Sequence, residues 1–168
     1  GRLIAENLRL SGIDVNCAPL GDIAQPDTHH ILRNRCYGTD KSEVIINARA
    51  LNSGLRHGGI SGVLKHIPGH GRAKLASHLA LPKVLLDQAV LEDTDFSVFK
   101  ELKEMDMGMT AHLIFDQLDP KNPATQSPTV INMIRNEIGF TGLLITDDIS
   151  MNALEGNLKT RALKALGA

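Results

Sequence analysis

Several titratable side chains follow a short apolar segment near the middle of the chain, in residues 62–82. Three of the seven histidines, His66, His70 and His78, lie here, together with a glycine-rich turn and the cations Arg72 and Lys74. An apolar strand that ends in a cationic, glycine-rich loop is typical of an α/β active site, because the chemistry of such sheets lies at the carboxyl ends of their strands. This stretch therefore predicts a catalytic or binding loop.

The elements that must position this loop alternate along the chain. Helical spacing occurs in residues 2–11, 42–57, 93–105, 127–138 and 158–168, with Ser42 as a candidate N-cap. Apolar strands are expected at residues 13–20, which we predict to be buried, and at 60–64, 107–115 and 142–146, and a long polar loop at 21–41. This alternation predicts a parallel sheet with right-handed crossovers.

Polar side chains stand just after each of the four predicted strands. Their convergence on one face favours a (β/α)8 TIM-type barrel. A doubly wound sheet shares the alternation, but it would more often carry a GxGxxG phosphate motif, which this sequence lacks. The residues that follow the strands are Asp22 and Arg35, Lys65 and His66, His112, and Asp147 and Asp148.

The composition excludes several classes of function. A net charge of −1 gives no electrostatic case for a nucleic acid or an anionic membrane as partner, and no apolar run is long enough to predict a membrane-spanning helix. Cys17 and Cys36 form no metal or redox motif, so we expect free, buried thiols in a reducing compartment, with a disulfide as the lesser alternative. We find no signal peptide in the sequence.

Five motifs along the chain resemble those of a known family. They are Arg35-x-Tyr37-Gly38, Lys65-His66-x-Pro68-Gly69-His70-Gly71, Ser77-His78-x-x-Leu81-Pro82, Ala111-His112, and Ile134-Arg135-x-Glu137-x-Gly139-Phe140-x-Gly142 leading into Thr146-Asp147-Asp148-x-Ser150-Met151.

In these motifs the chain resembles the glycoside hydrolase family 3 β-N-acetylglucosaminidases, bacterial cytoplasmic enzymes of peptidoglycan recycling. The resemblance implies a barrel fold, a retaining mechanism through a covalent glycosyl-enzyme, and a muropeptide or oligosaccharide that contains N-acetylglucosamine as the substrate. We expect no metal, no cofactor, no nucleic acid and no membrane partner.

The resemblance also implies roles for five residues. Asp147 aligns with the catalytic nucleophile, and His78 with the general acid/base, a role that imidazole can fill because it titrates near neutral pH. Arg35, Lys65 and His66 align with the residues that hold the sugar. We expect His70 to shape its loop and Asp22 to organise a loop, while His112 could either pack in the core or contact the ligand. The competing interpretations are structural: a strand-end aspartate often caps a helix, which suits Asp148 better than Asp147, and Arg35 and Lys65 could be solvated or ion-paired.

Two features depart from the family pattern. The family places an aspartate two residues before the acid/base, where this chain has Ala76. A complete barrel needs roughly 250 residues, whereas this chain has 168. We interpret residues 1–168 as a partial barrel domain, cut at both ends. Its open edges would require a second copy through self-association, another partner, or the rest of a longer chain.

Two alternative functions follow from these departures. The first is a truncated or degenerate homologue that binds sugar weakly without turnover. The second, from another class, is a metal-dependent hydrolase that uses His66, His70, His78 and Asp147. The spacing of these four residues matches neither HExxH nor HxH on one strand, which disfavours the metal hypothesis.

Overall fold

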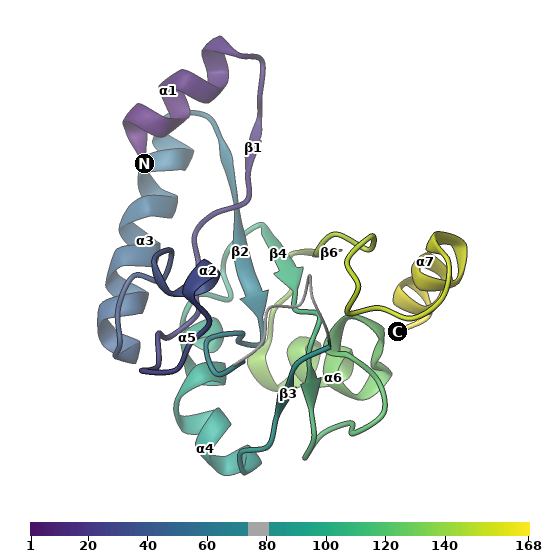
Figure 1. The fold of residues 1–168 in the computed structure, drawn as a ribbon. Coiled ribbons are helices and arrows are strands. Elements are labelled where there is room, and N and C mark those ends of the chain that lie inside the picture. The colour runs from purple at the N-terminus through teal and green to yellow at the C-terminus, as the bar shows by residue number, and fades with distance from the viewer. Residues whose placement is uncertain (74–80) are drawn as a thin grey trace.

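Four parallel strands form the central sheet of the protein, in the order β1-β2-β4-β6 (Figure 1). The computed structural model describes residues 1–73 and 81–168. A separate parallel pair consists of β3 (Lys83–Val84) and β5 (Ile114–Phe115). The strands of the central sheet are β1 (Val15–Asn16), β2 (Ser61–Ile67), β4 (Met107–Thr110) and β6 (Leu143–Thr146).

The register brings the carboxyl ends of three strands to one edge of this sheet. Ile67 of β2 lies opposite Thr110 of β4, and Thr110 lies opposite Thr146 of β6. Residues that directly follow these positions in the chain therefore lie near one another. This common edge is what positions the predicted site residues.

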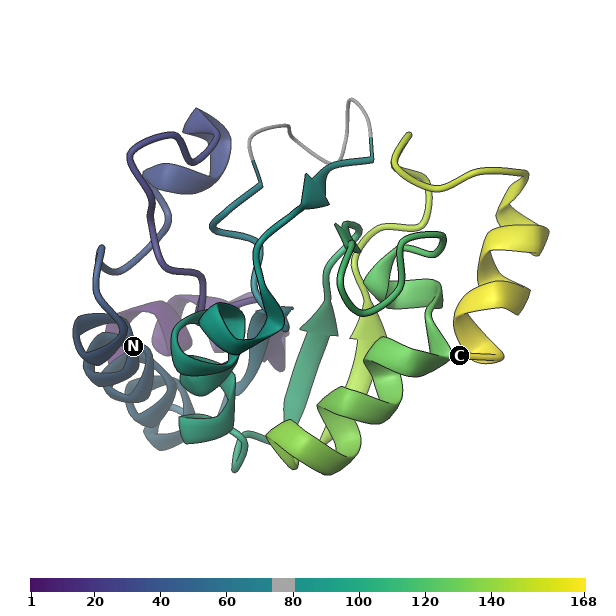
Figure 2. The same ribbon diagram turned by 90° about the horizontal axis from the view of Figure 1, so that it is seen from below.

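Helices cover one face of the sheet. Figure 2 shows α3, α5 and α6 side by side along this face, and α3 contacts both β2 and α5. The helices are α1 (Arg2–Leu10), α2 (His30–Arg33), α3 (Lys41–His57), α4 (Gln88–Asp93), α5 (Asp95–Glu101), α6 (Pro128–Met133) and α7 (Leu158–Leu166), with a 3₁₀ turn η1 (Ala124–Gln126) and a π turn η2 (Ile134–Ile138).

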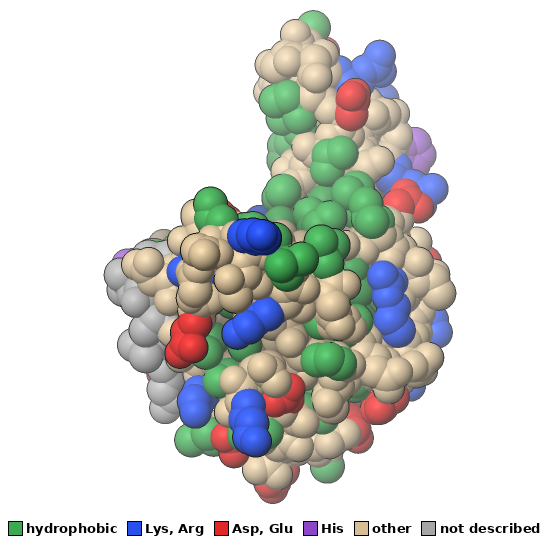
Figure 3. Space-filling view, turned by 90° about the vertical axis from the view of Figure 1, so that its right-hand side faces the viewer, with side chains coloured by type: hydrophobic (Ala, Val, Ile, Leu, Met, Phe, Trp, Pro, Cys, Tyr) green, Lys and Arg blue, Asp and Glu red, His purple; other side chains and the backbone are tan. Residues whose placement is uncertain are grey.

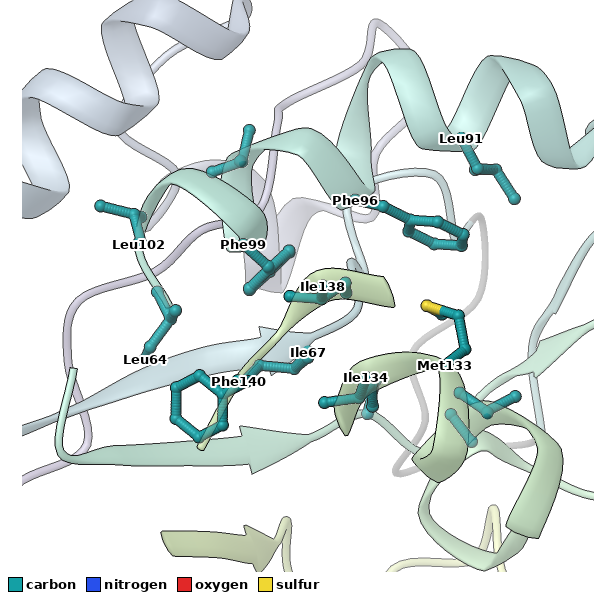
Figure 4. Packing of buried hydrophobic residues seen from close by; sticks show 14 of the residues in the cluster. Leu64, Ile67, Leu91, Phe96, Phe99, Leu102, Met133, Ile134, Ile138 and Phe140 are labelled. Carbon is teal, nitrogen blue, oxygen red and sulfur yellow. The ribbon is translucent and has the colours of Figure 1, made fainter. Parts of the chain in front are cut away.

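The main core lies between these helices and the strands β2 and β4 (Figure 4). Phe99 of α5 is fully buried against this layer, and truncation of such a side chain costs about 3–5 kcal/mol. Gly108 of β4 allows the close approach of Ile67 and Phe140, because a Cβ at this position would lie 2.5 Å from Ile67 Cδ1. The strands β2 and β4, which lead into the site, are thus held in place by packing.

The structure confirms the predicted α/β alternation but corrects several details. The N-cap of α3 is Asp40 rather than Ser42, since Asp40 Oδ1 accepts hydrogen bonds from the backbone N–H groups of Ser42 (2.8 Å) and Glu43 (3.1 Å). The loop at 21–41 contains the short helix α2. The helix predicted at 93–105 is two helices, α4 and α5, that meet at Thr94.

Two strand predictions and one cysteine prediction were also wrong in part. The strand expected at 13–20 is only β1, and Val15 is 41% exposed because β1 lies at the edge of the sheet. The strand expected at 107–115 is divided, since residues 111–113 leave the central sheet before β5 pairs with β3. Both thiols are free, but Cys17 is exposed and Cys36 is half-buried.

The two outer strands leave apolar side chains exposed. Within residues 1–73 and 81–168, β1 and β6 each pair with one strand only. Figure 3 shows hydrophobic side chains gathered on the face that carries β6 and α7, and this part of the chain has four large exposed apolar residues: Leu143, Leu158, Leu163 and Leu166. Self-association through these edges stays a prediction. None of the described helices is long and apolar enough to cross a membrane.

Candidate active site

Polar side chains from three segments meet at the carboxyl end of the central sheet. Lys65 and His66 belong to β2, and the peptide bond between them is cis. Asp147 directly follows β6. The chain before Asp22 reaches this edge through Leu20, which forms a parallel bridge with Lys65. The structure brings these residues together, but it corrects one prediction: β2 runs to Ile67, so Lys65 and His66 lie within the strand rather than after it.

His66 is held by the buried carboxylate of Asp22. The His66 Nδ1 atom lies 2.7 Å from Asp22 Oδ2, and Asp22 Oδ1 accepts the backbone N–H of His70 at 2.7 Å. Burial raises the pKa of the Asp22 carboxyl, but the charge and hydrogen bonds of His66 and the His70 backbone outweigh burial, and the pKa lies below its ordinary value. An ionised Asp22 requires a proton on His66 Nδ1.

This arrangement leaves the other nitrogen of His66 facing Asp147. The His66 Nε2 atom lies 3.8 Å from Asp147 Oδ2. Because Nδ1 carries the proton shared with Asp22, Nε2 of a neutral His66 can accept a hydrogen bond from a ligand hydroxyl. In the imidazolium form, Nε2 would instead donate and attract the Asp147 carboxylate. His66 can thus form a hydrogen bond with a polar ligand beside the predicted nucleophile.

The two carboxylate oxygens of Asp147 differ in their contacts. Its Oδ1 atom accepts the backbone N–H of Asp148 at 2.9 Å. The Asp147 side chain is 19% exposed, and among the described residues no hydrogen bond reaches its Oδ2 atom. Asp148 uses its own carboxylate differently, since it accepts the backbone N–H and the hydroxyl of Ser150, both at 2.8 Å. The capping-type role that sequence reasoning assigned to Asp148 rather than Asp147 agrees with this geometry.

Lys65 and Arg35 provide the cations of the site. Lys65 is 8% exposed, whereas Arg35 is exposed. Burial, and then the neighbouring Arg35 guanidinium, lowers the pKa of Lys65, while the Asp147 and Asp22 carboxylates act in the opposite direction. Lys65 is thus within electrostatic reach of both aspartates and of Arg35. These two cations can bind the hydroxyl oxygens of a sugar, because both side chains only donate hydrogen bonds.

His70 and Arg72 fix the turn that follows β2. His70 is 7% exposed, and burial, followed by the nearby His66, lowers the pKa of His70 to about 4. Arg72 donates from Nε to Asp95 Oδ2 at 2.5 Å, which ties the turn to the first residue of α5. Gly69 allows this contact, since it has φ 138° and a Cβ there would lie 3.0 Å from the Asp95 side chain. Sequence reasoning assigned His70 to shaping the loop, and its burial supports that role.

Sequence reasoning left His112 undecided and missed its partner. His112 is fully buried, with Nδ1 2.8 Å from Thr125 Oγ1 and Nε2 3.1 Å from the Asp148 carbonyl oxygen. Burial lowers the pKa of His112. No spacing rule connects Thr125 to His112, because Thr125 lies in a turn of irregular backbone. The only available signal was a threonine in a loop otherwise rich in Asp, Asn and Pro.

Two sequence predictions concern residues outside the described ranges. His78, the predicted acid/base, and Ala76 both lie there, so their roles stay predictions. The metal hypothesis includes His78 and stays untested as a whole. Within the part of the chain that the structure describes, no group of three or more His, Cys, Asp or Glu side chains is arranged to hold a metal ion.

Comparisons with known proteins agree with the sequence motifs. The model of the glycosyl hydrolase family 3 N-terminal domain matches residues 1–168. The curated β-hexosaminidase of Methylobacillus flagellatus is 33% identical over 174 residues, which cover 100% of this chain and 49% of the relative. That of Alkalilimnicola ehrlichii is 34% identical over 173 residues, with 100% and 49% covered. The chain therefore spans about half the length of these relatives.

Solved structures show the same fold. A family 3 β-N-acetylglucosaminidase from Paenibacillus sp. superposes with a TM-score of 0.92 at 32% identity, over 99% of this chain and 33% of that chain. NagZ from Neisseria gonorrhoeae superposes with a TM-score of 0.89 at 31% identity, over 99% and 48%. A further structure of that NagZ is a complex with N-trifluoroacetyl-D-glucosamine. The predicted barrel-type α/β class is confirmed.

Proposed function

The chain belongs to glycosyl hydrolase family 3, and we propose that the protein containing it removes β-linked N-acetylglucosamine by a retaining mechanism. The substrate class is a muropeptide or another oligosaccharide that ends in this sugar, and the biological setting is peptidoglycan recycling in the cytoplasm. Support for the sugar comes from the matched β-hexosaminidases and from the N-acylglucosamine complex of the Neisseria protein.

One observation carries the proposal: among the residues that the structure describes, no hydrogen bond reaches Oδ2 of Asp147, at the edge where the cations and His66 meet. Its Oδ1 accepts the Asp148 N–H (2.9 Å), and its Oδ2 lies 3.8 Å from His66 Nε2. A nucleophile must keep one oxygen fixed and the other free to reach the anomeric carbon. Neither Asp22 nor Asp148 fits this requirement, because both oxygens of each carboxylate accept hydrogen bonds.

The first step of the proposed reaction forms a bond between Asp147 Oδ2 and the anomeric carbon. The bond from that carbon to the leaving oxygen breaks, and the leaving oxygen takes a proton from the acid/base, His78. In the second step, water attacks the anomeric carbon, gives its proton to the same residue and displaces Asp147. Two inversions at one carbon retain the β configuration.

The residues around Asp147 would hold the sugar for this attack. Lys65 and Arg35 donate hydrogen bonds to sugar hydroxyls. His66, fixed by Asp22, adds a third contact whose direction is set by its Nδ1 proton. Fixed contacts of this kind raise the rate by keeping the anomeric carbon near the attacking oxygen.

A second candidate is a homologue that binds the sugar without turnover. Ala76 favours it, because the family aspartate at this position supports the charged form of the acid/base, and no Asp or Glu occurs between His66 and Leu86. The two candidates differ in what they do to a substrate with a good leaving group. An enzyme with a weak acid would still cleave it, because such a substrate needs little protonation, whereas the non-catalytic homologue would not.

The test is hydrolysis of two aryl N-acetylglucosaminides by the full-length protein, one with an acidic phenol as leaving group and one with a weakly acidic phenol. We expect cleavage of the first, with the β-anomer as the initial product in a proton NMR time course. Binding of N-acetylglucosamine without cleavage of either substrate would select the non-catalytic homologue. An α-anomer as initial product would contradict the retaining mechanism.

A further inference from the structure

We propose that His112 is a positioning residue for the nucleophile and that Thr125 sets its hydrogen-bonding state. This inference rests on the proposed function, and it concerns a pair of residues that contribute no group to the reaction itself. His112 follows β4 and Thr125 belongs to η1, so both come from segments other than the one that carries Asp147.

A continuous series of contacts runs from Thr125 to the carboxylate of Asp147. Thr125 Oγ1 lies 2.8 Å from His112 Nδ1, and His112 Nε2 lies 3.1 Å from the Asp148 carbonyl oxygen. The N–H of Asp148 in turn donates to Asp147 Oδ1 at 2.9 Å. His112 and the Asp147 carboxylate thus act on the two ends of one residue, Asp148.

The acceptors in this series determine where the protons lie. A carbonyl oxygen can only accept, so His112 Nε2 must carry a proton. Burial of His112 lowers its pKa, and the neutral ring therefore has its lone pair on Nδ1. That lone pair requires a donor, which is the hydroxyl of Thr125. The structure thus assigns the Nε2–H tautomer to His112.

This assignment is compatible with the other hydrogen-bonding groups around Thr125, because each of them keeps a partner. The hydroxyl of Thr110 lies 3.0 Å from Thr125 Oγ1 and can donate to it. The Thr125 hydroxyl is also placed to donate to the carbonyl oxygen of Ala111 at 2.9 Å. That oxygen accepts the Thr125 backbone N–H as well, at 3.3 Å, so it keeps a partner when the single hydroxyl proton is directed to His112.

Fixing Asp148 has a direct consequence for Asp147. The Asp148 carbonyl oxygen also accepts the backbone N–H of Met151 at 3.1 Å, and His112 adds a second restraint to this oxygen. With that restraint removed, the Asp148 backbone could shift, its N–H would point less accurately at Asp147 Oδ1, and the carboxylate could turn Oδ2 away from the sugar. A displacement of about 1 Å at such a site can cost about a hundredfold in rate. The side chain of Asp148, held by Ser150, fixes the same residue from the solvent side.

Two substitutions of His112 separate its two nitrogens. His112→Gln places an amide N–H near the position of Nε2 and can still donate to the Asp148 carbonyl, whereas His112→Asn reaches only toward Thr125. In the full-length protein we expect His112→Asn to lower kcat by about 30-fold with KM within threefold, and His112→Gln to recover most of this loss. Equal losses in both variants, or a rise in KM at unchanged kcat, would overturn the proposal.

Substitutions of Thr125 provide a second test in case His112→Asn does not fold. Thr125→Val keeps the shape of the side chain but removes the donor, while Thr125→Ser keeps the donor. We expect Thr125→Val to lower kcat by about fivefold and Thr125→Ser to recover most of that loss. The same loss in both variants would contradict a role for the hydroxyl.

A measurement that needs no catalysis keeps this proposal apart from the proposed function. Nitrogen-15 NMR of the His112 ring should show the neutral Nε2–H tautomer, and amide exchange at Asp148 should be about tenfold faster in Thr125→Val and His112→Asn than in the wild type. An Nδ1–H tautomer, or unchanged exchange, would overturn the positioning role. If these NMR results hold but no glycoside is cleaved, the proposed function fails by itself.

Discussion

Two histidines flank Asp147, and they differ in what their Nδ1 atom contacts. For His66 the contact is the buried carboxylate of Asp22 at 2.7 Å, and for His112 it is the hydroxyl of Thr125 at 2.8 Å. The other nitrogen also differs, since His66 Nε2 faces the Asp147 side chain across 3.8 Å while His112 Nε2 contacts a backbone carbonyl at 3.1 Å.

The partner of Nδ1 therefore separates the two roles. A carboxylate fixes a proton on Nδ1, which leaves Nε2 available to a ligand beside the nucleophile. A hydroxyl can donate to Nδ1, which suits a neutral ring that only supports the backbone. Histidine thus contacts the ligand at position 66 and positions the backbone at position 112.

Removal of the carboxylate between the two histidines should have the largest effect. We expect Asp147→Ala to lower kcat by about a thousandfold or more, equivalent to about 4 kcal/mol of barrier, with cooperative unfolding retained. Steady-state kinetics with an activated aryl N-acetylglucosaminide provides the measurement. Asp93→Asn, which removes an exposed carboxylate on α4, is the matched control and should leave kcat unchanged. Retention of more than about a tenth of kcat by Asp147→Ala would contradict the assignment of Asp147 as the nucleophile.

A third histidine, His70, tests how far burial rather than a partner controls a ring in this site. Its pKa is lowered to about 4 by burial and by His66. Between the ordinary value and about 4, the unfolded chain binds a proton that the folded protein does not, so stability should fall as the pH falls through this window. The expected loss is about 3 kcal/mol between pH 7 and pH 4.

Urea unfolding at a series of pH values measures this loss. His70→Gln should reduce the slope, and the part that remains should include His112, whose pKa burial also lowers. His57→Gln, at an exposed position on α3, should leave the slope in place. Asp22 contributes mainly below the window, because its pKa is lowered from 3.8. An unchanged slope in His70→Gln would assign the pH dependence to other groups.

Replacement of the Asp22 carboxylate should allow His66 to adopt the Nε2–H tautomer that we assign to His112. In Asp22→Asn the amide can no longer attract a proton to His66 Nδ1, and the ring is free to carry its proton on Nε2 instead. We expect kcat/KM to fall by about 30-fold and its pH profile to shift. Asp95→Asn, which weakens the buried ion pair with Arg72 in the turn after β2, controls for lost stability. An unchanged pH profile would show that Asp22 only supports the fold.

The smallest effect is expected at His78, because this chain has Ala76 where the family has an aspartate. We predict that Ala76→Asp raises kcat by about tenfold for substrates with poor leaving groups, because a carboxylate two residues before His78 would support its charged form. Rates for aryl glycosides of increasing phenol pKa test this. Activated substrates should respond little. If activity toward poor leaving groups is unchanged or falls, the dyad interpretation of this loop is wrong.

Strand ends were the part of the molecule that the sequence predicted best. Apolar runs that stop at polar residues placed Lys65, His66 and Asp147 at one edge, and the parallel register confirms this grouping. Exposure of β1 could not be predicted, because an apolar run does not say whether its strand lies at an edge. The N-cap of α3 was missed because Asp40 and Ser42 are both good caps only two residues apart.

The supporting contacts of the site were the least predictable. Asp22 was recognised only as a carboxylate that organises a loop, and its partner His66 is 44 residues away in the chain. Thr125 contacts His112 through a turn whose path depends on the packing of η1 and α6. Such contacts have no period in sequence, so they emerge only from the folded backbone.

The central claim is that Asp147 forms the covalent bond to the sugar. A 5-fluorinated N-acetylglucosaminyl fluoride tests it most directly, since its fluorine slows hydrolysis of a glycosyl-enzyme more than its fluoride leaving group slows formation. Peptide mass spectrometry of the treated full-length protein should find one sugar residue attached to Asp147, and none in Asp147→Ala. A sugar attached to Asp22, Asp148 or any other side chain would contradict the account.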